Sequence, residues 1–352
     1  MNIDKGQLYA KLEDASGGFI LNEDPSKQKS RPILNPVGLH RRIPLMPHQM
    51  VDRITRFEDF FSLIHLGAPR LEASDWSMTV GGMVRNPYLI SFDELLRLPK
   101  TEITSVHQCA GNPMQPNIAT RRVASVTWGG VDLKLLLDRA RPDPAASFLW
   151  AFGSDYGDFD GAYCDEYGKD LPISRVREGD ILVAYELNGR ALPAENGFPA
   201  RLVVPGFYGT NSVKWLTRIE LADRRLENLF TTKYYNDTLA DGSRRPVWDI
   251  PVESIIVSPA PDAALRKGEE VTIWGWAWAS SGVESVEVFV DEQWLRADFE
   301  ESKRAWSRFE IRWRPVASGE VVLKVKATSR AGHEQPEANA RNAIHTVLVI
   351  VS

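Results

Sequence analysis

The C-terminal hundred residues place the strongest constraint on the fold. After the proline-rich stretch DIPVESIIVSPAPDAAL, which begins at residue 249, short segments of alternating apolar and polar residues follow one another at even spacing. These segments are EVTIWGWAWA, SVEVFVDEQWL, WSRFEIRWRP, EVVLKVKATS and AIHTVLVIV. Alternation with a period of two predicts half-buried strands, and five or more such strands in about 100 residues indicate a β-sandwich. We therefore expect a sandwich domain over residues 249–352.

The preceding part of the chain, residues 51–248, has a mixed pattern. Helical periodicity is present in RITRFEDFFSLIHLG, SFDELLRLP and VDLKLLLDRA. The segments WSMTVGGMV, SFLWAFGS, DILVAYELNG and ARLVVPG have the composition of strands that end at glycine or turn residues. Because helices and strands do not alternate regularly, we expect an α+β domain with a mixed sheet. Residues 1–50 contain five prolines and no sustained period, which predicts an extended N-terminal arm.

Charge and hydropathy limit the kinds of partner. The 352 residues include 42 basic and 47 acidic side chains, for a formal net charge of -5, which argues against nucleic acid or an anionic membrane surface as a partner. The N-terminus lacks the basic and apolar regions of a signal peptide, and no later segment reaches the roughly 18 apolar residues of a membrane span. We therefore expect a soluble cytoplasmic protein, or a periplasmic one if the chain is a trimmed mature form.

The stretch SVHQCAGNPMQPN contains Cys109, one of only two cysteines; the other is Cys164. Two cysteines are too few for a disulfide framework. A thiolate is both a nucleophile and a soft metal ligand, so Cys109 is compatible with a buried space-filler, a catalytic nucleophile or a ligand to a metal. The cysteines and six histidines form no CxxC or HExxH spacing, which argues against zinc. A metal bound by Cys109 would therefore take most of its ligands from a cofactor.

A second stretch, NGFPARLVVPGFYGTNSVKWLTRIEL over residues 196–221, places charges where packing alone would not. Arg201 lies in an apolar strand, and Lys214 precedes Trp215 in another apolar segment. A buried cation needs an anionic partner, and a cofactor phosphate that approaches the glycines of this stretch would supply one. The alternative is that both are surface side chains whose apolar stems cover the protein.

These two stretches together resemble the sulfite oxidase family of molybdenum enzymes. DFFSLIHLGAP, TWGGVDLKLLL, DILVAYELNG and WGWAWASSGVESVEVFVDEQWLRADF are also similar to family segments, so the resemblance covers most of residues 50–352. It implies a sulfite-oxidase-type domain over residues 51–248 that binds molybdenum-molybdopterin. It also implies that residues 249–352 form an immunoglobulin-like dimerisation domain, and hence a homodimer. The sequence has no haem motif and no flavin fingerprint, so we expect electrons to leave to an external acceptor such as a cytochrome.

The same resemblance assigns roles to individual residues. It makes Cys109 the protein ligand of molybdenum, Tyr167 the active-site tyrosine and Arg341 an anion-binding arginine of the substrate site. Tyr167 has an alternative interpretation as an ordinary half-buried tyrosine. The resemblance implies cofactor contacts for Phe61, Ser62, Leu63, His65, Cys109, Asp155, Asn196, Arg201, Ser212, Val213 and Lys214.

The substrate is where this sequence departs from the family. Sulfite-oxidising members have arginines at the positions of Leu63 and Met114, and only Arg341 remains of the three. The implied activity is two-electron oxygen-atom transfer at a small sulfur-containing or related substrate, and sulfite itself is doubtful unless Arg121 or Arg122 compensates. Two alternatives from other classes are a cofactor-free relative that acts as a binding or dimerisation module, and a thiol hydrolase.

The loop before Tyr167 is rich in carboxylates, with Asp155, Asp158, Asp160, Asp165 and Glu166. Their spacing differs from that of an EF-hand calcium loop, so we expect a solvated turn. We expect Cys164 in this loop to be a small space-filler.

Overall fold

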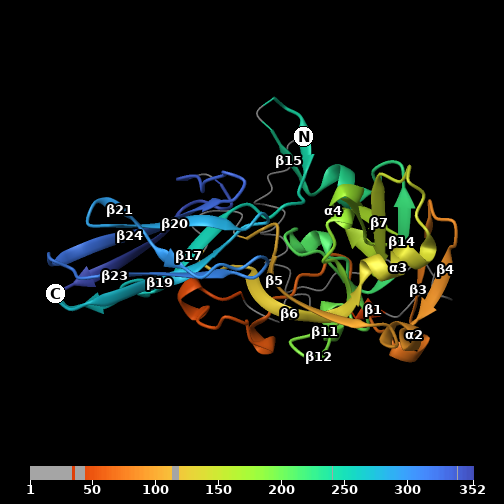
Figure 1. Ribbon diagram of the computed structural model, residues 1–352, viewed down its shortest axis with the longest axis horizontal. Coiled ribbons are helices and arrows are strands. Elements are labelled where there is room, and N and C mark those ends of the chain that lie inside the picture. Colours follow the sequence, from red (N-terminus) through yellow and green to blue (C-terminus); the bar gives the residue numbers. More distant parts are fainter. Residues whose placement is uncertain (1–33, 36–43, 113–118, 240, 339) are drawn as a thin grey trace.

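The computed structural model describes the following residues: 34–35, 44–112, 119–239, 241–338 and 340–352. Most of the predicted arm over residues 1–50 lies outside these ranges, as does Met114. Figure 1 shows a β-sandwich at one end of the long axis and a region of mixed helices and strands at the other. The predicted fold class, a mixed α+β domain followed by a sandwich, is therefore confirmed.

Two sheets form the frame of the N-terminal part. The first has the strand order β10 (Gly168–Pro172), β7 (Phe148–Gly153), β14 (Leu216–Ala222), β3 (Ser77–Gly82) and β4 (Tyr88–Ser91). The second has the order β12 (Arg190–Ala191), β11 (Leu182–Leu187), β6 (Val123–Asp132) and β5 (Lys100–Gln108), with β13 (Arg201–Val203) also paired to β11. Strands β14 and β3 are parallel and the remaining pairs are antiparallel, which makes the first sheet mixed.

Short elements connect these strands. The two-stranded pairs are β1 (Leu34–Asn35) with β2 (Ala68–Pro69), β8 (Gly157–Phe159) with β9 (Ala162–Cys164), and β15 (Asn236–Thr238) with β16 (Arg244–Pro246). Single 3₁₀ turns lie at Pro47–Gln49, Phe57–Asp59, Ala73–Asp75, Ala194–Asn196 and Gly209–Asn211, and a π turn lies at Leu229–Lys233.

The helices are α2 (Phe92–Leu96), α3 (Leu133–Ala140) and α4 (Ile173–Arg177). Helix α3 begins after Asp132, whose side chain accepts a hydrogen bond from the backbone N–H of Lys134 at 2.8 Å. Its buried residues are those of the apolar face that VDLKLLLDRA predicts: Leu133, Leu136, Leu137 and Ala140. The helix at VDLKLLLDRA is therefore as expected.

The helix expected over RITRFEDFFSLIHLG is wrong. Only the 3₁₀ turn at Phe57–Asp59 forms there, and the following segment runs without regular structure through the interior. Within residues 60–66 every side chain except Leu63 is buried. A helix at the edge of a domain keeps one polar face in water, whereas this segment is surrounded by protein on all sides.

The C-terminal part consists of two facing sheets. One has the order β17 (Glu253–Ser258), β19 (Val271–Trp278), β23 (Ser307–Trp313) and β22 (Asp298–Phe299). The other has the order β18 (Ala264–Leu265), β25 (His345–Val351), β24 (Gly319–Ser329), β20 (Val283–Val290) and β21 (Gln293–Arg296). SVEVFVDEQWL is a hairpin rather than one strand, because Asp291 and Glu292 both have positive φ and form the tight turn.

Tryptophans of the sandwich join it to the N-terminal part. The indole N–H of Trp276 donates to the carbonyl of Met50 at 2.6 Å, and that of Trp306 donates to the carbonyl of Arg53 at 2.8 Å. The two indole rings stack with centroids 5.0 Å apart. The junction is therefore a packed core that adjoins strand β5, which leads to Cys109. Among the described residues, no helix is long and apolar enough to cross a membrane.

Candidate functional site

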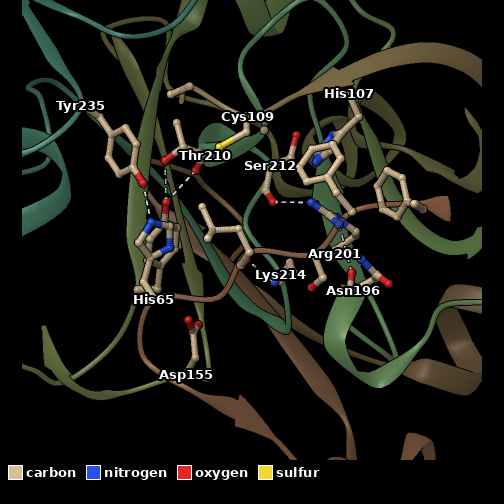
Figure 2. A pocket seen from close by; sticks show the side chains of 17 residues that line it. His65, His107, Cys109, Asp155, Asn196, Arg201, Thr210, Ser212, Lys214 and Tyr235 are labelled. Atoms are coloured by element: carbon tan, nitrogen blue, oxygen red, sulfur yellow. Dashed lines mark hydrogen bonds between the residues drawn. The ribbon is translucent and has the colours of Figure 1, made fainter. Parts of the chain in front are cut away.

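A pocket collects most of the predicted site residues (Figure 2). It lies where Cys109 follows the end of β5 and where segment 60–65 meets the loops around β13. The predicted residues that line it are Phe61, Ser62, Leu63, His65, Cys109, Asp155, Tyr167, Asn196, Arg201, Ser212 and Lys214. Val213 does not line the pocket; its side chain is 1 % exposed and belongs to the hydrophobic core.

Cys109 is held by hydrogen bonds on both sides of its turn. Its backbone N–H donates to the carbonyl of Arg122 at 2.9 Å, and the side-chain oxygen of Asn112 accepts from the backbone N–H of Arg122. The backbone N–H of Gly111 donates to Cys109 Sγ at 3.4 Å. A donor aimed at sulfur favours its negatively charged form, so the turn suits a thiolate that faces the pocket.

Two buried cations lie at the far side of the pocket. Arg201 donates from Nη1 to the carbonyl of Asn196 at 3.0 Å and from Nη2 to the carbonyl of Ser212 at 2.8 Å. Lys214 Nζ donates to the carbonyls of Leu63 and Glu195, at 2.8 and 3.0 Å. Burial lowers the pKa of Arg201 to about 9 and also lowers the pKa of Lys214. Buried cations whose hydrogen bonds end on neutral carbonyls are suited to an anionic ligand.

Unsatisfied acceptors lie beside these cations. Within the described part of the chain, the Oδ1 atoms of Asp155 and Asn196 are buried and have no hydrogen-bond partner. Burial raises the pKa of Asp155. Gly197 has a φ of +105°, and a Cβ there would lie about 3 Å from the Cβ atoms of both Arg201 and Lys214. A ligand with N–H donors and a phosphate would match both the acceptors and the cations, so the residues fit a phosphate-bearing pterin.

Aromatic side chains form another wall of the pocket. The rings of His65 and Tyr167 stack with centroids 5.4 Å apart and an interplanar angle of 21°. Tyr167 Oη donates to the carbonyl of Thr210 at 2.9 Å and is 2.7 Å from Thr210 Oγ1. Tyr235 Oη is hydrogen-bonded to His65 Nε2. The hydroxyl of Tyr167 is thus fixed in the pocket and is not a loose, half-buried group.

Several residues that line this pocket were not predicted from the sequence. His107 precedes Cys109 by two positions, and burial lowers its pKa well below the usual value, which keeps the imidazole neutral. Gly209 packs against it, since a Cβ at Gly209 would lie 2.7 Å from His107 Nε2. The period of two in strand β5 could have indicated His107. Thr210 and Tyr235 also line the pocket. Tyr235 lies outside every motif from which the other site residues were predicted.

Arg341 does not line the pocket of Cys109. Its Nη1 donates to the carbonyl of Ala110 at 3.1 Å, and its Nη2 is 2.6 Å from each carboxylate oxygen of Asp237. Arg341 instead faces a second cavity together with Arg121 and Glu253. Neither Arg121 nor Arg122 lines the first pocket.

The acidic loop has other partners. Asp160 accepts from Lys233 at 3.1 Å, and Glu166 forms an ion pair with Arg218. Within the described residues no three His, Cys, Asp or Glu side chains group as ligands for a metal ion. Cys164 is buried, and burial raises the pKa of its thiol to about 11. A protonated, buried thiol agrees with the expected space-filling role.

Comparisons with known proteins agree with this geometry. Residues 65–230 match the oxidoreductase molybdopterin binding domain, and residues 244–349 match the Mo-co oxidoreductase dimerisation domain. The chain is 30% identical to sulfite oxidase of Gallus gallus, over 82% of this chain and 69% of the relative. It is 29% identical to sulfite oxidase of Arabidopsis thaliana, over 81% of this chain and 82% of the relative.

A solved structure is also similar over most of its length. The sulfane dehydrogenase SoxCD from Paracoccus pantotrophus superimposes with a TM-score of 0.75 and 29% sequence identity, covering 86% of this chain and 82% of that chain. Sequence, fold and pocket therefore agree. The chain belongs to the sulfite oxidase family of molybdopterin-dependent oxidoreductases.

Proposed function

We propose that this family member transfers an oxygen atom at a small sulfur-containing substrate, oxidises sulfite poorly, and passes electrons to an external acceptor such as a cytochrome. The observation that supports the proposal is that one pocket contains both the thiolate-favouring turn at Cys109 and, at its far side, the buried cations Arg201 and Lys214. A cofactor that contains both a metal and a phosphate would account for one soft ligand and two buried cations in one pocket.

The chain's own residues have separate tasks in this proposal. Cys109 would hold molybdenum, while Arg201, Ser212 and Lys214 would hold the pterin phosphate by charge-assisted hydrogen bonds. Asp155 and Asn196 would accept hydrogen bonds from the pterin, with His65 beside it. When bound, the cofactor supplies the metal that takes up two electrons from the substrate.

Tyr167 would position the substrate. Its hydroxyl is held by Thr210 and its ring by the stack on His65, so its orientation does not depend on the substrate. Because its proton is donated to the Thr210 carbonyl, the fixed hydroxyl oxygen can accept a hydrogen bond from a substrate group at a low entropy cost of orientation.

The proposal that the protein oxidises sulfite poorly rests on Leu63 and Arg341. Leu63 lines the pocket with an apolar side chain, and Arg341 is paired with Asp237. Each charge-assisted hydrogen bond that an anion loses is worth about 1.5–3 kcal/mol. A substrate that is larger, or less charged than sulfite, suits such a pocket better.

We also propose that residues 51–248 form the catalytic domain and that residues 249–352 form the dimer interface. The match of residues 244–349 to a dimerisation domain supports a homodimer. Light scattering at micromolar concentration tests it, and a monomer mass would reject it. The proposal includes no haem and no flavin, which the absorption spectrum of the purified protein can test.

The experiment that tests the function measures molybdenum and pterin in purified protein, followed by oxidation of sulfite and of uncharged sulfur compounds with an artificial electron acceptor. The proposal expects about one molybdenum per chain and faster turnover of the uncharged compounds. Protein without molybdenum or pterin after expression with cofactor supply would support a cofactor-free binding module. Covalent labelling of Cys109 by an acyl electrophile, with no molybdenum, would support a thiol hydrolase.

A further inference from the structure

The immediate surroundings of Arg341 bear on which substrates can approach Cys109. Arg341 reaches the Cys109 turn from the sandwich, because its Nη1 donates to the carbonyl of Ala110, the residue after Cys109. Its guanidinium also lies over the ring of Tyr208, 5.4 Å from the centroid. Both the arginine side chain and its carboxylate partner are only partly exposed, at 22% and 24%. The charge of Arg341 is therefore placed within reach of the turn and is shielded from solvent on most sides.

Asp237 pairs with Nη2, the second terminal nitrogen of the Arg341 guanidinium. Both of its carboxylate oxygens are 2.6 Å from Nη2 of Arg341, so each terminal nitrogen of the arginine has an acceptor, one a carbonyl and one a carboxylate. An ion pair of this geometry cancels most of the long-range attraction that an isolated arginine exerts on an anion. The positive charge of Arg341, which lies outside the pocket but contacts the Cys109 turn, is thus compensated at this point.

The chain fixes Asp237 in this place. Strand β15 begins at Asn236, whose side-chain amide donates to the carbonyls of Thr231 and Tyr234, at 3.0 and 2.8 Å. Tyr235 and Asp237 are two positions apart; Tyr235 lines the pocket of Cys109, and Asp237 meets Arg341. The same short segment therefore contributes one residue to the cofactor pocket and one to the arginine beside it.

We propose that Asp237 is a specificity-determining residue, which neutralises Arg341 and so disfavours anionic substrates at the Cys109 site. This inference rests on the proposed function and deepens it, since it names uncharged sulfur compounds as the favoured substrate class. The opposite possibility is that Asp237 only orients Arg341 so that the arginine can bind an anion. The two possibilities predict opposite effects of removing the carboxylate charge.

The test uses molybdenum-loaded protein and the variant Asp237→Asn, which keeps the size of the side chain and an acceptor oxygen. Asp138→Asn is the matched control, because it removes a negative charge from an exposed ion pair with Lys134 on helix α3. The proposal predicts that Asp237→Asn lowers the KM for sulfite about tenfold, with kcat nearly unchanged. It also predicts that inorganic sulfate binds about tenfold more tightly by calorimetry. The control should change neither.

The double variant Asp237→Asn/Arg341→Met should lose both gains, because the released charge is then absent. An unchanged or higher KM for sulfite, together with unchanged or weaker sulfate binding in Asp237→Asn, would overturn the inference and favour the orienting role. If thermal melting shows that Asp237→Asn is unfolded, Asp237→Ser serves in its place. Parent protein without molybdenum would sink the proposed function, while sulfate calorimetry would still decide the role of Asp237.

Discussion

Gln108 donates its side-chain amide to Glu253 at 2.7 Å, in a fully buried hydrogen bond that ties the residue before Cys109 to the sandwich strand β17. The side-chain oxygen of Gln108 accepts from the indole N–H of Trp278 on β19, also at 2.7 Å. Both polar ends of this side chain are therefore held by the C-terminal part. The position of Cys109 depends on how the sandwich packs against β5.

The first prediction concerns this contact. Glu253→Leu should lower the free energy of unfolding by about 1–3 kcal/mol, because it leaves the buried amide of Gln108 without an acceptor. It should also lower molybdenum occupancy, since the residue before Cys109 loses one of its two anchors. Chemical denaturation and metal analysis measure both effects. Glu253→Gln retains an acceptor and is the control; equal losses in the two variants would show that the hydrogen bond is not the cause.

The second prediction concerns pH. Burial raises the pKa of Glu253 from 4.5 to about 8. Between these values the folded protein keeps a proton that the unfolded chain releases, so this residue makes the protein less stable as pH rises through the window. The stability of Glu253→Gln relative to the parent should therefore increase between about pH 5 and pH 8. Denaturation curves across this range test it, and a constant difference would contradict the assignment.

The third prediction tests the cationic end of the pocket. Lys214→Met should reduce the amount of bound pterin, because a charge-assisted hydrogen bond to phosphate is worth about 1.5–3 kcal/mol. Pterin fluorescence after release from the protein gives the occupancy. Lys134→Met, on the exposed face of α3, should have no effect. Full occupancy and unchanged thermal stability in Lys214→Met would place the phosphate site elsewhere.

The fourth prediction concerns sulfite. Restoring two arginines in Leu63→Arg/Met114→Arg should add about 3–6 kcal/mol of anion stabilisation, or roughly 10²- to 10⁴-fold in catalytic efficiency if it is fully felt in the transition state. Steady-state kinetics with an artificial acceptor measures the change. A parent protein that already reaches about 10⁶ M⁻¹s⁻¹ with sulfite would show that these arginines are not needed.

Part of this molecule could be predicted from local sequence. Helix α3 and the sandwich strands β20, β23, β24 and β25 follow from their periodicity, because buried and exposed residues alternate along them, whereas β17 is buried along nearly its whole length. The structure of residues 60–66 could not be predicted, since all their side chains except that of Leu63 are buried. The segment therefore shows neither the period of a half-buried helix nor that of a half-buried strand. The turn at Asp291 and Glu292 was missed because glutamate, unlike aspartate, is not a typical residue at positive φ.

Some residues of the candidate site could likewise be predicted from the sequence, and others could not. Motifs that are continuous in sequence, such as the turn at Cys109 and the segment around Arg201, place their residues in one pocket. Tyr235 and Asp237 could not be predicted, because their roles depend on long-range contacts to His65 and Arg341. Sequence similarity alone would assign Arg341 to an anion site. In the structure the carboxylate of Asp237 compensates the positive charge on which that role depends.

The most direct test of the account is turnover per bound molybdenum in Cys109→Ser, with Cys164→Ser as the matched control. A hydroxyl is a hard and weakly acidic ligand, whereas molybdenum favours a thiolate. We predict that Cys109→Ser folds, retains pterin and has no measurable turnover per bound molybdenum, while Cys164→Ser keeps the turnover of the parent. Turnover per bound molybdenum in Cys109→Ser equal to that of the parent would contradict the account.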